Sequence, residues 1–331
     1  MFLVSMFLIG CLAGWIASTL ACILLAPVTF QGIVHCRHCH HVFPRWSHWF
    51  RPWPLKCTSC SRRDSLWPWL SAGATGAVFA GFTWMLIRAN CQSIEEVQPS
   101  GSLTTGRLPF HLWLIFLLVL VTLTDLLDYV ISDIVVIVGV VSAVVLAVFS
   151  GELQMIHVWV NWDEAIPGLR GPYLPTWMDQ HQHLHGLVWS LAGMATGAGL
   201  LWILRLSAQL VLGTPAVGFG DVTMMAMVGA FVGWQPTLCI IALAPLAGMV
   251  VGPVIRWITG RSFVAFGPYL AVSTLIILCS WSTIWRDWSL RTVFSHWPSV
   301  VGLVAGAVVV LTLLLLVVRG FRSLPTSAMR R

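Results

Sequence analysis

Residues 109–127 read PFHLWLIFLLVLVTLTDLL, an almost unbroken apolar run. A helix needs about 20 such residues to cross the hydrocarbon core of a bilayer, where every backbone amide must be hydrogen-bonded within the segment. The sequence therefore predicts an all-α polytopic membrane protein, a helical bundle of eight or nine spans. The other apolar runs lie at residues 2–27, 66–88, 134–150, 186–210, 222–234, 237–255, 263–281 and 299–318, and the short run at 222–234 would be the ninth span.

The composition of the 331 residues fits a bilayer rather than water. Hydrophobic residues make up 58% of the chain and charged residues only 9%, where a soluble domain carries roughly 25% charged residues. So few charges cannot coat a water-exposed globule, which excludes a soluble enzyme, a disordered tail and a collagen-like rod. The net charge of +6 comes almost wholly from arginines clustered in particular loops. This clustering indicates membrane topology rather than nucleic-acid binding.

The distribution of basic residues predicts the orientation. If the nine runs are threaded in order and the loop 28–65 is cytoplasmic, 13 of the 18 arginines and lysines fall on the cytoplasmic side. Cytoplasmic loops are enriched in these residues, so this threading is favoured over its reverse. It places the loop 28–65 in a reducing compartment, where thiols bind metals rather than forming disulfides. The five basic residues on the other side are Arg88, Arg107, Arg170, Arg286 and Arg291.

The loop 28–65 carries two C-x2-C pairs with a gap of seventeen residues between them, a spacing within the range of zinc ribbons. Four thiolates would complete a closed tetrahedron without a position for water, so the pairs predict a structural zinc site. The loop is too short to fold around a hydrophobic core of its own, so a bound metal ion would stabilise its fold. The predicted ligands are Cys36, Cys39, Cys57 and Cys60, although His35, His38, His40 or His41 could replace one of them.

Four of the twelve acidic residues lie at the ends of apolar runs. A carboxylate at the membrane interface is costly unless it is paired or hydrated. Helix capping would account for Asp133 and Asp221, because each precedes an apolar run. Capping does not account for Asp125, which has apolar neighbours on both sides. The four residues are Asp125, Asp128 and Asp133, within LTDLLDYVISD at 123–133, and Asp221, which ends the string GFGD at 218–221.

The expected threading brings Asp125 and Asp221 to the same cytoplasmic face from different helices. Two carboxyl groups within hydrogen-bond reach in a low dielectric share one proton. One can then act as a base toward water while the other, protonated, polarises a carbonyl, which is acid–base machinery for peptide hydrolysis. Gly218 and Gly220 would let the backbone approach closely at Asp221. The pair is therefore the candidate catalytic dyad.

These residues, in this order, resemble the prepilin peptidases of bacterial type IV pilus and type II secretion systems, which are aspartic membrane proteases of the G-x-G-D type. In that family the first catalytic aspartate shortly precedes a second acid, as Asp125 precedes Asp133, and the second catalytic aspartate ends G-x-G-D, as Asp221 does. The resemblance covers roughly residues 8–281. Further matches are the paired C-x2-C loop, RDSLW at 63–67, GAFVGW at 229–234 and FGPYL at 266–270.

The chain also departs from the family pattern. Ser132 stands where the family usually has proline, and Thr223 stands where it usually has lysine two positions after G-x-G-D. Loss of that lysine removes a cation that could tune the dyad or hold a substrate carboxylate. The first span lacks the Asn-x-x-x-x-Arg ending of the family, and the loop 151–185 and the last span look like additions. The resemblance therefore implies a divergent member.

The resemblance implies an endopeptidase of the bacterial inner membrane that removes the basic leader of prepilins or pseudopilins at the cytoplasmic face. Asp128 and Asp133 would bind the leader, and Gly218 and Gly220 would support the site. Family members often also methylate the new N-terminus with S-adenosylmethionine, although the chain has no nucleotide-binding pattern. The expected organisation is a first span at 1–27, a cytoplasmic zinc loop at 28–65, a peptidase core at 66–281, and an additional span and basic tail at 282–331.

Two other interpretations stay open. In the first, the protein is a transporter or scaffold whose intramembrane acids carry protons or metal ions. Three histidines could then bind metal ions at the entrance of the transport path, or they could simply lie in a hydrated loop. They are His181, His183 and His185. In the second, the fold is that of the peptidase and the chemistry is lost, for which Thr223 is the best support.

Overall fold

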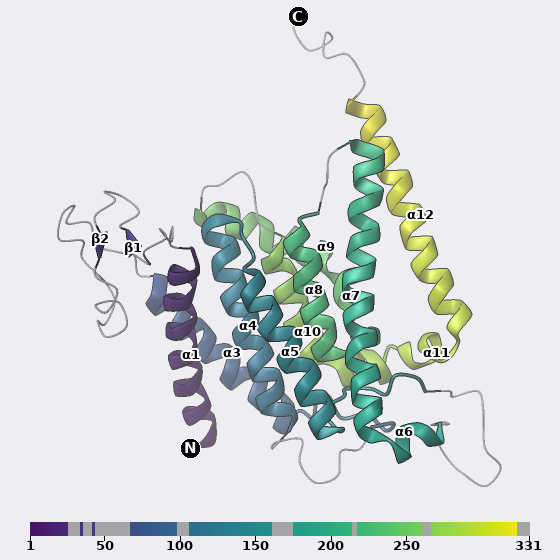
Figure 1. Ribbon diagram of the computed structural model, residues 1–331, viewed down its shortest axis with the longest axis horizontal. Helices are drawn as coiled ribbons and strands as arrows, with labels where there is room; N and C mark the ends of the chain where they lie inside the picture. Colours follow the sequence, from purple (N-terminus) through teal and green to yellow (C-terminus); the bar gives the residue numbers. More distant parts are fainter. Residues whose placement is uncertain are drawn as a thin grey trace, which may run out of the picture.

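The computed structural model describes residues 1–25, 34–35, 42–43, 67–97, 106–160, 175–213, 217–259 and 266–322, and within these ranges the chain is almost entirely helical (Figure 1). The long helices are α1 (Phe2–Leu25), α3 (Trp67–Ile87), α4 (Arg107–Asp128), α5 (Asp133–Ser150), α7 (Gln182–Leu212), α8 (Phe219–Val232), α9 (Trp234–Thr259), α10 (Gly267–Arg286) and α12 (Trp297–Arg322). Two short helices are α6 (Thr176–Gln180) and α11 (Leu290–Ser295). The strands β1 (Val34–His35) and β2 (Val42–Phe43) pair antiparallel.

The helices confirm a polytopic membrane bundle. Six of them, α1, α3, α4, α5, α7 and α10, are long and apolar enough to cross a bilayer. Three further apolar segments are shorter: α8, the first part of α9 (Trp234–Val250) and the first part of α12 (Trp297–Val310). Over the described residues, each of the nine predicted runs coincides with one of these helices. The short run predicted at 222–234 is α8, which is separated from α9 by Gly233 in the left-handed region (φ 82°).

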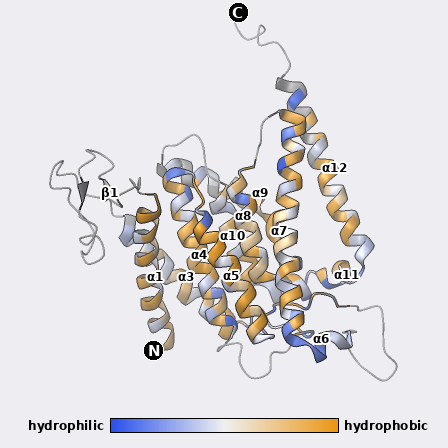
Figure 2. Cartoon of the chain, in the orientation of Figure 1, coloured by the Kyte–Doolittle hydropathy of each residue, from blue (hydrophilic) through white to orange (hydrophobic). Residues whose placement is uncertain are grey.

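The outer surface of the bundle is apolar, the reverse of a soluble protein. The helices at the outside of the bundle, such as α1 and α5, are coloured largely as hydrophobic (Figure 2). Large side chains such as Phe149, Leu210 and Val250 are 78%, 81% and 72% exposed. In water such exposure would cost about 25 cal/mol per Å² of apolar surface, whereas lipid tails accept it. These side chains therefore mark the surface that faces hydrocarbon.

Small residues allow the central helices to pack closely. Gly193 of α7 and Gly229 of α8 face each other, and a Cβ added to either would collide with the backbone carbonyl of the other. In lipid, helices associate through such close packing because the hydrophobic effect between them is lost. The contact fixes α8 against α7 and so positions the N-terminus of α8, where Asp221 lies.

One end of the bundle, the lower end in Figure 1, is closed by the segments 88–97 and 151–160. Arg107, only 1% exposed, donates from Nη2 to the carbonyl oxygen of Gln154 at 2.5 Å. Gln235 donates from Nε2 to the carbonyl oxygen of His157 at 2.9 Å, and Trp285 donates from Nε1 to Oε1 of Glu96 at 2.6 Å. Helix side chains thus bind backbone and side-chain oxygens of the covering segments. We call this set of contacts the closing network.

Candidate functional site

Asp125 lies in the last turn of α4, at the upper end of the bundle in Figure 1. Its side chain is 6% exposed, and the backbone N–H of Gly267 donates to its Oδ2 at 3.0 Å. Tyr129 follows α4 in the left-handed conformation (φ 57°), and its N–H caps the carbonyl of Asp125 at 3.0 Å. The helix ends at Asp128, within one turn of Asp125, so the carboxyl group stands at the edge of the apolar run.

Gly267 was not among the predicted site residues, although the segment 266–270 was singled out. It is the first residue of α10, so the Asp125 carboxyl group meets the positive end of that helix. A Cβ at position 267 would collide with Oδ2 of Asp125. The signal in the sequence is a Gly-Pro pair just before an apolar run, which is typical of a helix start. The partner of that helix start could not be read from the sequence.

Asp221 occupies the third position of α8. Its side chain is 7% exposed, and the N–H of Gly218, the residue that caps the helix, donates to its Oδ2 at 3.2 Å. Asp221 therefore takes part in capping α8 from its third position, whereas the N-cap residue itself is Gly218. Capping engages one carboxyl oxygen, so it is compatible with a second role.

The carboxyl groups of Asp125 and Asp221 interact electrostatically. Their helices, together with α10, pack pairwise against one another. The structure thus brings together two acids that lie almost a hundred positions apart, and both are nearly buried. A single negative charge on such a pair is far less costly than two, which is the condition for sharing a proton.

Gly220 allows the connection between α4 and α5 to pack over the start of α8. A Cβ at position 220 would lie 3.0 Å from the Cβ of Ile131, which is closer than ordinary van der Waals contact. A larger residue at position 220 would therefore require Ile131 to shift by a few tenths of an ångström. Gly218 contributes through its backbone N–H.

Asp128 and Asp133 are exposed at the same end, on either side of this connection. Asp133 begins α5, where its charge suits the helix dipole, and Ser132 makes no side-chain capping hydrogen bond. Neither acid joins the buried pair. Their predicted role in binding a basic leader stays a prediction.

The predicted zinc ligands Cys36, Cys39, Cys57 and Cys60 lie outside the described residues. The short strands β1 and β2 flank the first pair in sequence. Among the residues that are described, no group of three or more His, Cys, Asp or Glu side chains converges in a way that could hold a metal ion. Zinc in the loop 28–65 therefore stays a prediction.

The histidines of the candidate metal path do not form a row. His185 is buried in the closing network, where the N–H of Val158 donates to its Nε2 at 3.1 Å and Gln154 bonds its Nδ1 at 2.9 Å. His181 and His183 are exposed, and the Nδ1 of His183 bonds the carbonyl of Val148 at 2.7 Å. Protein groups occupy both ring nitrogens of His185, so this arrangement does not favour metal binding there.

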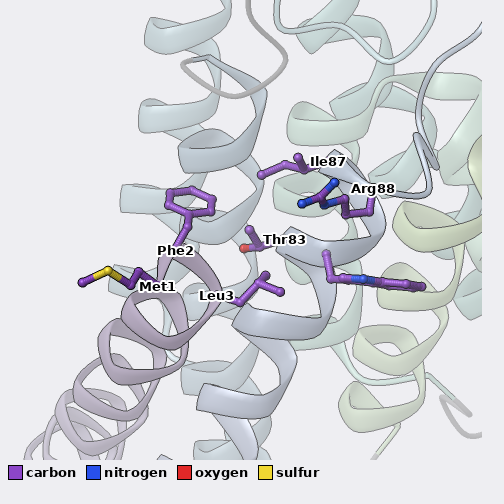
Figure 3. Close-up of a pocket in the computed structure, with 7 residues that line it drawn as sticks. Met1, Phe2, Leu3, Thr83, Ile87 and Arg88 are labelled. Carbon is purple, nitrogen blue, oxygen red and sulfur yellow. The ribbon is translucent and has the colours of Figure 1, made fainter.

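A pocket lies at the end opposite to the two acids, between the start of α1 and the end of α3 (Figure 3). Thr83, Trp84, Ile87 and Arg88 line it together with the first residues of α1. The lining is mainly apolar and contains no acid. The pocket is therefore separate from the candidate site.

Part of the chain is similar to prepilin leader peptidase/N-methyltransferases. It is 35% identical to the protein of Neisseria gonorrhoeae over 97 residues, which are 29% of this chain and 34% of the relative. It is 34% identical to the protein of Pseudomonas aeruginosa over 106 residues, 31% of this chain and 35% of the relative. With the protein of Escherichia coli K12, 34% identity extends over 97 residues, 29% of this chain and 42% of the relative.

The similarity thus spans less than half of each of these relatives. No family model matches the chain, and no solved structure matches it.

Proposed function

We propose that the chain is an intramembrane aspartic endopeptidase that cleaves the basic leader of type IV prepilins or type II secretion pseudopilins. The observation that carries the proposal is the placement of two nearly buried carboxyl groups, Asp125 and Asp221, on mutually packed helices at one end of a membrane bundle. The similarity to prepilin leader peptidase/N-methyltransferases supports the same class of reaction.

The proposed chemistry follows from one proton shared by two acids. The ionised carboxyl group removes a proton from water, which attacks the scissile carbonyl carbon, while the protonated one donates to the carbonyl oxygen. The tetrahedral intermediate then collapses: the carboxyl group that took the proton from water gives it to the leaving nitrogen, and the other carboxylate takes a proton from a hydroxyl group of the intermediate. The C–N bond breaks, and the pair again holds one proton in its starting arrangement. The N–H groups of Gly218 and Gly267 hold one oxygen of each acid and so orient the other toward the substrate.

The proposed substrate has a basic leader directly before an apolar helix. Asp128 and Asp133 are exposed beside the buried pair and would attract lysines and arginines of the leader. The apolar helix of the substrate would lie in the bilayer against the lipid-facing surface. The scissile bond would then meet the dyad where leader and helix join.

We infer that the dyad faces the cytoplasm of a bacterial inner membrane, with α12 ending on the same side (Figure 1). The excess of basic residues on this side of the threading supports the orientation. A fluorescent protein fused after residue 331 is expected to fluoresce, and alkaline phosphatase at the same position is expected to be inactive. The opposite pair of results would place the dyad on the outer face.

Two further components belong to the proposal. Cys36, Cys39, Cys57 and Cys60 would hold a structural zinc ion, measurable as one equivalent of metal in the purified protein and lost on substitution by serine. S-adenosylmethionine would supply the methyl group for the new N-terminus, as the names of the relatives suggest. Mass spectrometry of the processed pilin tests this second activity independently of cleavage.

The proposal is tested by co-expression with a prepilin in a host without its own prepilin peptidase. The wild type is expected to shorten the pilin on a gel, whereas Asp125→Asn and Asp221→Asn leave it at full length and still insert in the membrane. Asp179→Asn, an exposed aspartate at the opposite end, serves as the matched control. Full processing by either dyad variant would rule out the aspartic mechanism.

The same assay separates the alternatives. A transporter or scaffold leaves the pilin unchanged in every variant, including the wild type. An inactive paralogue also leaves it unchanged, but Thr223→Lys would then raise the activity. Ser132→Pro is the corresponding test for the other departure from the family pattern.

A further inference from the structure

Two side chains of α7 hold the segment that leads into Asp221. Arg205 donates from Nη1 to the carbonyl oxygen of Val217, the residue directly before Gly218. Trp202, three positions earlier on the same helix, packs edge-to-face on Phe219, with ring centroids 5.9 Å apart. The residues on both sides of Gly218 are therefore fixed to one face of α7.

Arg205 also carries a charge toward the dyad. Its guanidinium group interacts electrostatically with the Asp221 carboxyl group. A buried pair of acids with one shared proton keeps one negative charge in a low dielectric, and a nearby cation offsets part of that cost. The side chain of Arg205 is partly buried, so solvent screens this interaction less than it would at a surface.

Thr223 is occupied within its own helix. Its hydroxyl group donates to the carbonyl oxygen of Gly220 at 3.0 Å. Threonine carries no charge, so position 223 supplies no cation where the family usually has a lysine. The cation near Asp221 comes instead from the neighbouring helix.

We propose that Arg205 is a positioning residue for the dyad, which holds the turn before Asp221 in place and stabilises the singly ionised pair. This inference rests on the proposed peptidase function. Arg205 would then supply, from α7, the positive charge that a lysine at position 223 supplies in the family. This explains why threonine can occupy position 223.

The test compares Arg205→Gln and Arg205→Lys in a cleavage assay with purified protein and a prepilin peptide. Arg205→Gln is expected to lower kcat roughly 10- to 100-fold with KM changed less than about twofold, because dyad geometry and charge are affected rather than leader binding. Arg205→Lys retains the charge, and we expect kcat within about fivefold of the wild type. Arg286→Gln, an exposed arginine at the opposite end, is the control for loss of a positive charge.

Thermal melting of each variant separates positioning from folding. A kcat loss in Arg205→Gln that Arg205→Lys largely restores, at equal melting temperatures, supports the inference. Wild-type kcat in Arg205→Gln overturns it. An equal loss in both variants that follows a lowered melting temperature also overturns it, because the role is then structural.

Two further variants connect this test to the proposed function. Thr223→Lys is expected to change kcat less than about twofold, because Arg205 already supplies the cation. Asp221→Asn is included in the same assay. Cleavage by Asp221→Asn would refute the aspartic peptidase itself, whereas an inactive Asp221→Asn beside a fully active Arg205→Gln would refute only the role of Arg205.

Discussion

The two ends of the bundle bury polar groups in different ways. In the closing network, Arg107, Gln235 and Trp285 donate to oxygen atoms of the segments that cover them, so opposite or complementary groups meet. At the other end, two nearly buried carboxyl groups, Asp125 and Asp221, lie on helices that pack against each other. Each accepts a hydrogen bond from a backbone N–H, of Gly267 and Gly218 respectively. The hydrogen bonds of the closing network offset part of the cost of burying its polar groups, although within the described residues Nε of Arg107 and Oε1 of Gln235 make none. Two buried carboxyl groups close to each other raise the free energy of the folded state. A protein retains such a cost where the acids have a chemical task.

The largest expected effect concerns the dyad as a unit. Asp125→Asn and Asp221→Asn should each lower kcat by more than about 1,000-fold, and the double variant should be no worse than either single one. Residues that share one proton lose their common function when either is removed. Single-turnover cleavage rates measure the three variants. Losses that multiply in the double variant would contradict a shared proton.

Arg107→Ala tests the opposite end and should act on stability alone. It leaves buried carbonyl groups of the closing network without their donor, at a cost of about 2–4 kcal/mol. The melting temperature in detergent should fall clearly, while kcat below that temperature stays within about twofold of the wild type. Arg286→Gln removes an exposed arginine at the same end and should leave the melting temperature unchanged. A loss of kcat without a loss of stability would mean that this end takes part in the chemistry.

Gly267→Ala tests whether the start of α10 holds the Asp125 carboxyl group in place. The added Cβ would meet Oδ2 of Asp125, so either the carboxyl group or the start of α10 must move. A displacement of this kind costs up to about 100-fold in rate, and we expect kcat to fall 10- to 100-fold. Gly81→Ala on α3 is the control, because a Cβ there meets nothing within 4 Å. Equal activity of the two variants would show that Asp125 is not held as described.

The smallest expected effect is a pH dependence of stability at the closing network. Burial lowers the pKa of His157 from its ordinary value of 6.5, and the nearby charge of Arg107 acts in the same direction. The unfolded chain therefore takes up a proton that the folded protein does not, so stability is lost as the pH falls below about 6.5.

The melting temperature should thus decrease between pH 7.5 and pH 5.5, and less steeply in His157→Gln. His181→Gln, an exposed histidine, should keep the wild-type slope. Identical slopes in all three proteins would show that His157 does not contribute.

Much of the fold could be predicted because lipid imposes a simple rule on the sequence. Nine apolar runs predicted nine helices, and each run coincides with a helix over the described residues. The rule that a carboxyl group at the end of an apolar run is expensive singled out Asp125 and Asp221, which are buried, but also Asp128 and Asp133, which are exposed. It did not indicate Glu96, which is buried against Trp285 in the closing network. The His-rich segment was harder, because nothing in its sequence shows that His185 is buried while His183 is exposed.

The contacts around the acids could not be predicted, since they depend on how helices pack. Gly267 reaches Asp125 across 142 positions, and Arg205 reaches Val217 from another helix. Local sequence identifies a helix start or an arginine near the end of a span. It does not identify which group of another helix will lie beside it.

The sequence by itself determined that this chain crosses a membrane repeatedly and that four of its acids stand where apolar runs end, because the cost of burying charge and unpaired amides acts on each segment separately. Only the tertiary structure decided that two of them, Asp125 and Asp221, are buried on packed helices, which backbone groups hold them and which cation stands near them. Those relations arise from close packing between α4, α7, α8 and α10, and packing depends on shapes brought together from distant parts of the chain.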